Sequence, residues 1–165
     1  MKYFFILISF ILMFNIFSVT NEDRLIVTND DFDNISWYED MDNNIEEGSY
    51  PSNAFPYNIY LRCKVLKNGD KKLYLYIAGL QTIEKLIINI DKNNYEYISY
   101  NDKSGTMGLV DLIDKENELK IIESITKSNN VKLRASNNDG YYTDVILDES
   151  QLNSIRNVFR FYSKK

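Results

Sequence analysis

Histidine is absent from this chain of 165 residues, and cysteine occurs once, as Cys63. The absence of histidine removes the commonest general base of enzymes and the commonest protein ligand of zinc. A single cysteine cannot form an intrachain disulfide, so no disulfide framework holds the fold. The sequence also lacks a GxSxG nucleophile elbow, a phosphate-binding glycine loop and a dinucleotide-binding fingerprint. We therefore predict a protein that is not an enzyme and that uses no cofactor.

Proline (2 residues) and glycine (6 residues) are scarce, whereas hydrophobic residues make up 44% of the chain. This composition favours a packed domain over a disordered chain. The formal net charge of −5 is unevenly spread, because residues 21–50 hold 10 acidic residues and one basic residue. Residues 51–165 hold 14 acidic and 17 basic residues. Neither segment has the strongly basic balance of a nucleic-acid-binding protein.

The N-terminus has the pattern of a secretory signal peptide. Lys2 precedes the apolar run YFFILISFILMFNIFSV, and small residues follow up to Thr20, which favours cleavage before Asn21. The run is nearly long enough to span a bilayer, so an uncleaved membrane anchor through residues 3–19 is the alternative. An exported domain without disulfides fits a bacterial envelope, so we expect a periplasmic or secreted bacterial protein.

We divide the chain into three parts. Residues 1–20 are the signal peptide or anchor, residues 21–56 an acidic, partly irregular leader, and residues 57–165 a β-rich domain closed by a C-terminal helix. Within the leader, short strands are expected at residues 25–27 and 35–38.

The stretch YNIYLRCKVLKNGDKKLYLYIAG predicts a β-hairpin around a glycine turn. A two-residue turn would mix apolar and polar faces, so a three-residue loop at 68–70 is favoured. This loop pairs Val65 with Leu73 and Cys63 with Leu75, and it points Cys63 inward as an inert core thiol.

The opposite face of this hairpin is a candidate binding surface of three tyrosines and two cations: Tyr60, Arg62, Lys64, Tyr74 and Tyr76. Tyrosine combined with basic residues suits a partner protein, such as an envelope protein, or a glycan. The alternative is that a helix or a second sheet buries this face, since aromatic residues are common in strands for packing reasons. Trp37 is interpreted as a packing anchor.

Residues 85–90 and 95–100 predict another strand pair across a loop at 91–94, with the register left open. A strand is expected at 107–113. A helix follows, with Leu119, Ile122 and Ile125 on one side and Asp114 as its N-cap.

Residues 131–135 and 141–147 predict a second hairpin. A three-residue loop at 138–140 places Arg134 opposite Asp144, so Arg134 is expected in a cross-strand ion pair and not in a ligand site.

The helix that follows starts with a capping box and a hydrophobic staple, formed by Leu147, Asp148, Gln151 and Leu152.

A calcium site is a second hypothesis, because Asp40, Asp42 and Asn44 alternate as at the start of an EF-hand loop. The sixth position is Ile45 and the twelfth is Pro51, where that loop has glycine and glutamate. A looser oxygen cage therefore stays open as an alternative, and its ligands would come from Asp30, Asp31, Asp33, Asp40 or Asp42. A hydrolase that uses two carboxylates ranks third.

The order of elements and the stretches KLYLYIAG, KLIINID and NNVKLRA resemble small exported bacterial β-rich, sandwich-like domains of unknown function, over about residues 57–162. The pattern predicts an α+β fold, mainly an antiparallel, sandwich-like β-meander with one short internal helix and a C-terminal helix. We expect an exported protein-interaction or structural module. A small-ligand or calcium-binding protein is the alternative.

Overall fold

The computed structural model describes residues 24–31, 33–43, 58–78, 83, 85–97, 109–136 and 142–164. Over these ranges the chain forms nine strands in two antiparallel sheets, with two α-helices. The expected α+β, mainly antiparallel fold is therefore confirmed. The N-terminal run expected to be a signal peptide or anchor lies outside the described residues, among which no helix is long and apolar enough to cross a membrane.

The larger sheet has five strands in the order β1-β2-β3-β4-β7. Their bounds are β1 Leu25–Asp30, β2 Ile35–Asp40, β3 Asn58–Val65, β4 Lys71–Ala78 and β7 Leu109–Ile113. Both strands expected within the acidic leader are present. They are longer than expected, and β2 pairs with β3. This part of the leader is thus continuous with the sheet.

The smaller sheet has four strands in the order β6-β5-β8-β9. Their bounds are β5 Lys85–Ile90, β6 Asn93–Tyr97, β8 Val131–Ser136 and β9 Tyr142–Ile146. The chain leaves the larger sheet after β4, builds the β5–β6 hairpin, returns for β7 and then completes the smaller sheet. Neighbouring hairpins are therefore joined by the β5–β8 pairing, which no local pattern predicts.

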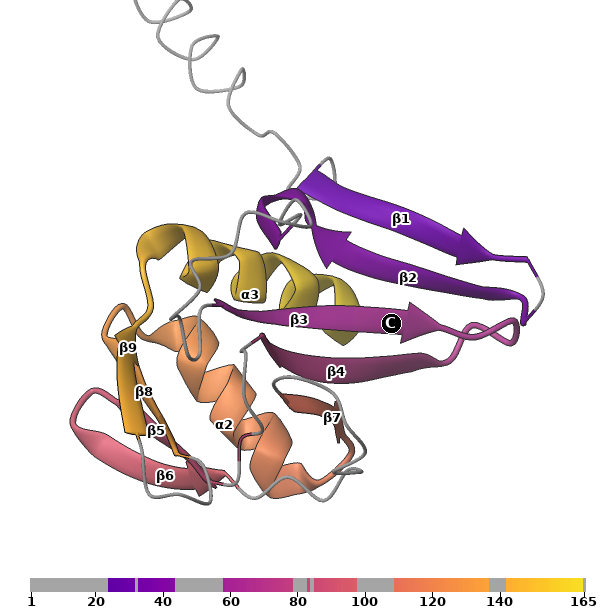
Figure 1. Cartoon of the computed structure of the whole chain (residues 1–165). Helices are drawn as coiled ribbons and strands as arrows, with labels where there is room; N and C mark the ends of the chain where they lie inside the picture. The colour runs from indigo at the N-terminus through magenta and orange to yellow at the C-terminus, as the bar shows by residue number, and fades with distance from the viewer. Residues whose placement is uncertain are drawn as a thin grey trace, which may run out of the picture.

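Two helices fill the space between the sheets (Figure 1). Helix α3 (Glu149–Ser163) packs along β2, β3 and β4, and α2 (Glu116–Lys127) lies between the smaller sheet and β7. Apolar side chains of both helices and both sheets form one buried cluster, which includes Leu61, Ile88, Ile122, Leu133 and Ile155. Each sheet thus has one face toward the helices and one outer face.

The register of the first hairpin differs from the predicted one by two residues. Cys63 pairs with Leu73, and Val65 pairs with Lys71. The loop begins one residue earlier than expected because Gly69 adopts a positive φ of 86°, and its amide donates to the Leu66 carbonyl. Glycine populates this conformation without steric strain. A shift of two residues preserves which side chains share a face, and Cys63 is fully buried as predicted.

The register left open by the sequence is set by a tight turn at Asp91 and Lys92, both with positive φ. Ile90 pairs with Asn93, so the second strand begins two residues earlier than expected. Two successive positive φ values are those of a type I′ turn, whose twist matches that of the flanking strands.

The two helix starts differ in how well the sequence predicted them. Lys115, and not Asp114, is the N-cap of α2, and the Glu118 carboxylate accepts bonds from the Lys115 backbone amide (3.3 Å) and ammonium (2.9 Å). At α3 the prediction is confirmed, since the Asp148 carboxylate accepts from the Gln151 amide at 2.8 Å.

The second hairpin has the predicted register. Arg134 lies opposite Asp144, and its guanidinium donates two hydrogen bonds of 2.6 Å to that carboxylate. These bonds hold the pKa of Asp144 below its usual value. The predicted cross-strand ion pair is confirmed, and both side chains are about half exposed.

Candidate functional site

The outer face of the larger sheet carries the aromatic and basic side chains predicted from the first hairpin. The register places Tyr60 opposite Tyr76 and Arg62 opposite Tyr74, with Lys64 next to Lys72. The five predicted side chains Tyr60, Arg62, Lys64, Tyr74 and Tyr76 are all half-buried. Because α3 packs on the opposite face of the sheet, these side chains are brought together outside the main core.

Contacts between aromatic rings and cations connect the side chains of this face. The rings of Tyr60 and Tyr76 stack with centroids 5.1 Å apart. The Arg62 guanidinium lies 5.5 Å from the Tyr76 ring centroid and 4.9 Å from that of Trp37. A guanidinium near two aromatic faces gains cation–π attraction from each, which restrains its position.

Trp37 on β2 belongs to the same surface. Its ring lies 5.2 Å from that of Tyr74, and the Lys64 ammonium lies 5.4 Å from its centroid. The sequence alone predicts a packing anchor at Trp37 and does not place this residue with the β3–β4 hairpin. The link is the β2–β3 pairing, which sets Trp37 directly opposite Lys64. We call this set of six residues the aromatic surface: Trp37, Tyr60, Arg62, Lys64, Tyr74 and Tyr76.

The charges around the aromatic surface are unbalanced. Glu39 lies 3.3 Å from the Arg62 guanidinium. Lys64 and Lys72 lie directly opposite each other on β3 and β4, and like charges in that relation destabilise a sheet. Burial raises the pKa of the Tyr74 phenol, with a further contribution from Tyr76. The surface therefore presents phenol rings together with an excess of positive charge.

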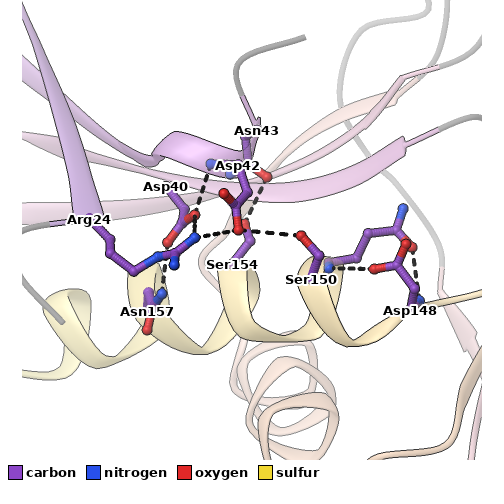
Figure 2. A network of polar contacts seen from close by, with 9 residues as sticks. Arg24, Asp40, Asp42, Asn43, Asp148, Ser150, Ser154 and Asn157 are labelled. Carbon is purple, nitrogen blue, oxygen red and sulfur yellow. Dashed lines mark hydrogen bonds and ion pairs between the residues drawn. The ribbon is translucent and has the colours of Figure 1, made fainter. Parts of the chain in front are cut away.

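A second constellation joins the end of β2 to α3 (Figure 2). Asp40 is fully buried, and its carboxylate accepts 2.7 Å from the Asn157 amide and 3.0 Å from the Asp42 backbone amide. Arg24 lies 3.8 Å from Asp40 and forms an ion pair with Asp42. One guanidinium thus lies near both carboxylates, and the hydrogen bond from Asn157 to Asp40 attaches the β1–β2 hairpin to α3.

Residues of the 3-10 helix η2 (Met41–Asn43) form further hydrogen bonds to α3. The Ser154 hydroxyl donates to the Asn43 side-chain oxygen at 2.7 Å, and the Ser150 hydroxyl to Asp42 at 3.3 Å. Asn43 and Ser154 are buried. These hydrogen bonds add to the apolar packing that holds the β1–β2 hairpin on the core, where Ile35 is buried and the Tyr38 ring stacks on Phe161.

The calcium hypothesis involves the same acidic residues. Asp40 and Asp42 are held by Arg24, Asn157 and backbone groups, and Asn44 lies outside the described residues. Within the described ranges, no group of three or more His, Cys, Asp or Glu side chains is arranged to hold a metal ion. The calcium site stays a prediction.

Two further titratable groups are buried in the core. Burial raises the pKa of Cys63 to about 11, which keeps it a neutral thiol. The Tyr97 hydroxyl donates 2.7 Å to the buried Asp111 carboxylate, and burial together with this hydrogen bond raises the pKa of the phenol. A thiol that stays protonated is a poor nucleophile, so the position of Cys63 fits a structural role.

Comparison with known proteins shows one remote structural likeness. No protein-family model matches the chain, and no curated protein is similar to it in sequence. A solved structure, the invasion associated protein B of Bartonella henselae, is similar with a TM-score of 0.42 and 10% sequence identity. The match covers 84% of this chain and 91% of that one.

Proposed function

We propose that this chain is an exported, non-catalytic binding module, and that its aromatic surface binds an acidic region of another protein. The observation that carries the proposal is the Arg62 guanidinium between Trp37 and Tyr76, in a half-buried cluster on the outer face of a sheet. Tryptophan, tyrosine and arginine are the residues that contribute most binding energy at protein interfaces.

The charge of the surface favours an acidic partner. Lys64 faces Lys72, and the Glu39 carboxylate is engaged by Arg62. A partner carboxylate placed between the two lysines would relieve their repulsion and add charge-assisted hydrogen bonds. Electrostatic complementarity of this kind acts on partner choice and association rate more than on affinity.

Rigidity of the surface supports the same proposal. The rings and the guanidinium contact one another, and their backbones belong to three paired strands, β2, β3 and β4. Side chains already held in position lose little conformational entropy on binding. Export rests on the sequence of residues 1–20 and on a single cysteine, buried at Cys63.

The test is crosslinking and capture of the tagged full-length chain from its native host, with mass spectrometry of the captured proteins. The wild type is compared with an Arg62→Glu, Tyr74→Ala variant and with Lys120→Glu, a control at an exposed position of α2. We expect one reproducible partner that the double variant loses by about tenfold or more and that the control keeps. Equal capture by all three chains would contradict the proposed surface.

The same experiment tests export. Peptides upstream of Asn21 in the captured bait indicate an uncleaved anchor, and their absence beside abundant peptides from Asn21 onward indicates a cleaved signal peptide. A bait recovered only from the cytosol with its N-terminus intact would contradict export.

A further inference from the structure

The outer face of the smaller sheet, on a different part of the molecule from the aromatic surface, has features of a second binding site. Strand β9 is the last strand of this sheet, and Figure 1 shows it far from β1 and β2. Its outer face carries the two most exposed large hydrophobic side chains of the described residues, Tyr142 at 62% and Ile146 at 68%. Exposed apolar side chains on an edge strand favour association with another molecule.

A groove of about 600 Å³ runs over this face from β9 to the β5–β6 turn. Apolar contact is available from Ile87 and Ile146, and polar contact from Asn89, Asn94, Lys92 and Lys132. These side chains come from all four strands and the turn, so the sheet itself gives the groove its shape.

The charge lining the groove is positive. Lys92, Lys132 and Arg134 outnumber Asp144, the one acidic lining residue, and Asp144 is engaged by Arg134. Over the described part of the chain, Lys92 and Lys132 have no ion-pair partner, in contrast to Lys85, which pairs with Glu96 at 3.0 Å on the same face. Lys132 also lies close enough to Asp144 to help lower the pKa of that carboxyl, but Asp144 is paired with Arg134, so the groove keeps a net positive charge beside Ile146. A complementary ligand would carry negative charge and an apolar side chain.

We propose that this groove binds an extended, acidic segment of a partner protein. Carboxylates of that segment would pair with Lys132 and Lys92, and one of its apolar side chains would cover Ile146. The Arg134 guanidinium lies 4.6 Å from the Tyr142 ring centroid and is held by Asp144, so it provides a fixed wall at the β9 end. A sugar polymer would match the cations but would leave Ile146 exposed, which favours a peptide.

Binding is tested with the full chain and labelled synthetic peptides, by fluorescence anisotropy. The probe is a short peptide that mixes glutamate with leucine. One control peptide has lysine in place of glutamate, and another has serine in place of leucine. We expect the probe to bind and both control peptides to bind about tenfold more weakly or worse. Added salt is expected to lower the affinity of the probe.

Four protein variants locate the site. Lys132→Glu and Ile146→Ser are expected to lower the affinity for the probe peptide by about tenfold or more. Lys120→Glu, on α2, is expected to leave that affinity unchanged. Both altered groove positions are exposed, so the fold should tolerate them. Loss of binding in Arg62→Glu but not in Lys132→Glu would assign the peptide to the aromatic surface and overturn this proposal.

Other occupants give distinct results. Binding of an acidic polysaccharide such as alginate, with no binding of the peptide, would overturn the proposal, as would no binding of either. Sedimentation of the chain without any ligand completes the test. Self-association that Ile146→Ser abolishes, with no peptide binding, would identify a second copy of this chain as the occupant and also overturn it.

Discussion

The Tyr97 hydroxyl donates a 2.7 Å hydrogen bond to the Asp111 carboxylate, and this bond joins the two sheets through the core. Tyr97 lies on β6 and Asp111 on β7, and the two residues are 3% and 2% exposed. A buried carboxylate is costly unless it accepts hydrogen bonds. The pair therefore fixes how the smaller sheet is placed against the larger one.

Tyr97→Phe removes this donor and keeps the ring. We expect the free energy of unfolding to fall by about 1–3 kcal/mol, because the carboxylate stays buried with one hydrogen bond fewer. Urea unfolding at neutral pH measures the change. Tyr142→Phe, at an exposed position, is the matched control and should change stability little. Equal stability of the two variants would show that the Tyr97–Asp111 bond contributes nothing net.

Alkaline pH should destabilise the fold through the same phenol. Burial first, and then the bond to Asp111, raise the folded-state pKa of Tyr97 above its usual value of 10.0. The protonated phenol therefore contributes fully to the free energy of unfolding below pH 10.0. This contribution is lost as the pH rises through the folded-state pKa. Urea midpoints of the wild type should fall above pH 10.0 more steeply than those of Tyr97→Phe. If the urea midpoints of the two proteins fell equally with pH, Tyr97 would not be the cause of the alkaline destabilisation.

Cys63 should resist alkylation in the folded protein. Burial raises its pKa from 9.0 to about 11, which lowers the thiolate fraction near neutral pH roughly a hundredfold, and the side chain is fully buried. Iodoacetamide labelling followed by mass spectrometry should be slow in buffer and fast in unfolding concentrations of urea. Fast labelling in buffer would mean that the edge of the core near Cys63 opens readily.

Arg156 on α3 holds the end of α2. Its guanidinium donates to the carbonyls of Thr126 (3.0 Å) and Ser128 (2.6 Å), which the end of a helix leaves without partners. Arg156→Met should cost about 2 kcal/mol and speed amide exchange in the last turn of α2. Arg160→Met, one turn along α3 at an exposed position, is the control. Unchanged exchange in α2 would contradict the capping role.

Asp40 should matter more than Asp42 for attaching the β1–β2 hairpin to α3. Asp40→Ala leaves the buried Asn157 amide without its acceptor and is expected to cost about 3 kcal/mol. Asp42→Asn alters a side chain that is 37% exposed and should cost about 1 kcal/mol or less. Thermal unfolding of both variants gives the comparison. A larger loss of stability in Asp42→Asn than in Asp40→Ala would show that Asp42 makes the more important attachment to α3.

Much of the local structure was predictable because its determinants lie close together in the sequence. Alternation with a period of two assigned Cys63 and Arg134 to their correct faces, and this parity survives the two-residue shift in the first hairpin. The capping box at Asp148 depends on four consecutive residues and was predicted in full. The α2 cap was missed because the Glu118 side chain, and not Asp114, satisfies the helix start.

How these elements assemble depends on contacts between residues far apart in the chain. The division into two sheets depends on the β5–β8 and β4–β7 pairings, whose partners are far apart in the chain and leave no periodic signal. The same holds for Trp37, which joins the aromatic surface through the β2–β3 pairing, and for Asp40 and Asp111, which are buried on partners from distant elements. By itself the sequence determined the strand faces, the helix that closes the fold and the inert cysteine, because backbone alternation and capping are local. Long-range pairing decided which faces meet and which stay open.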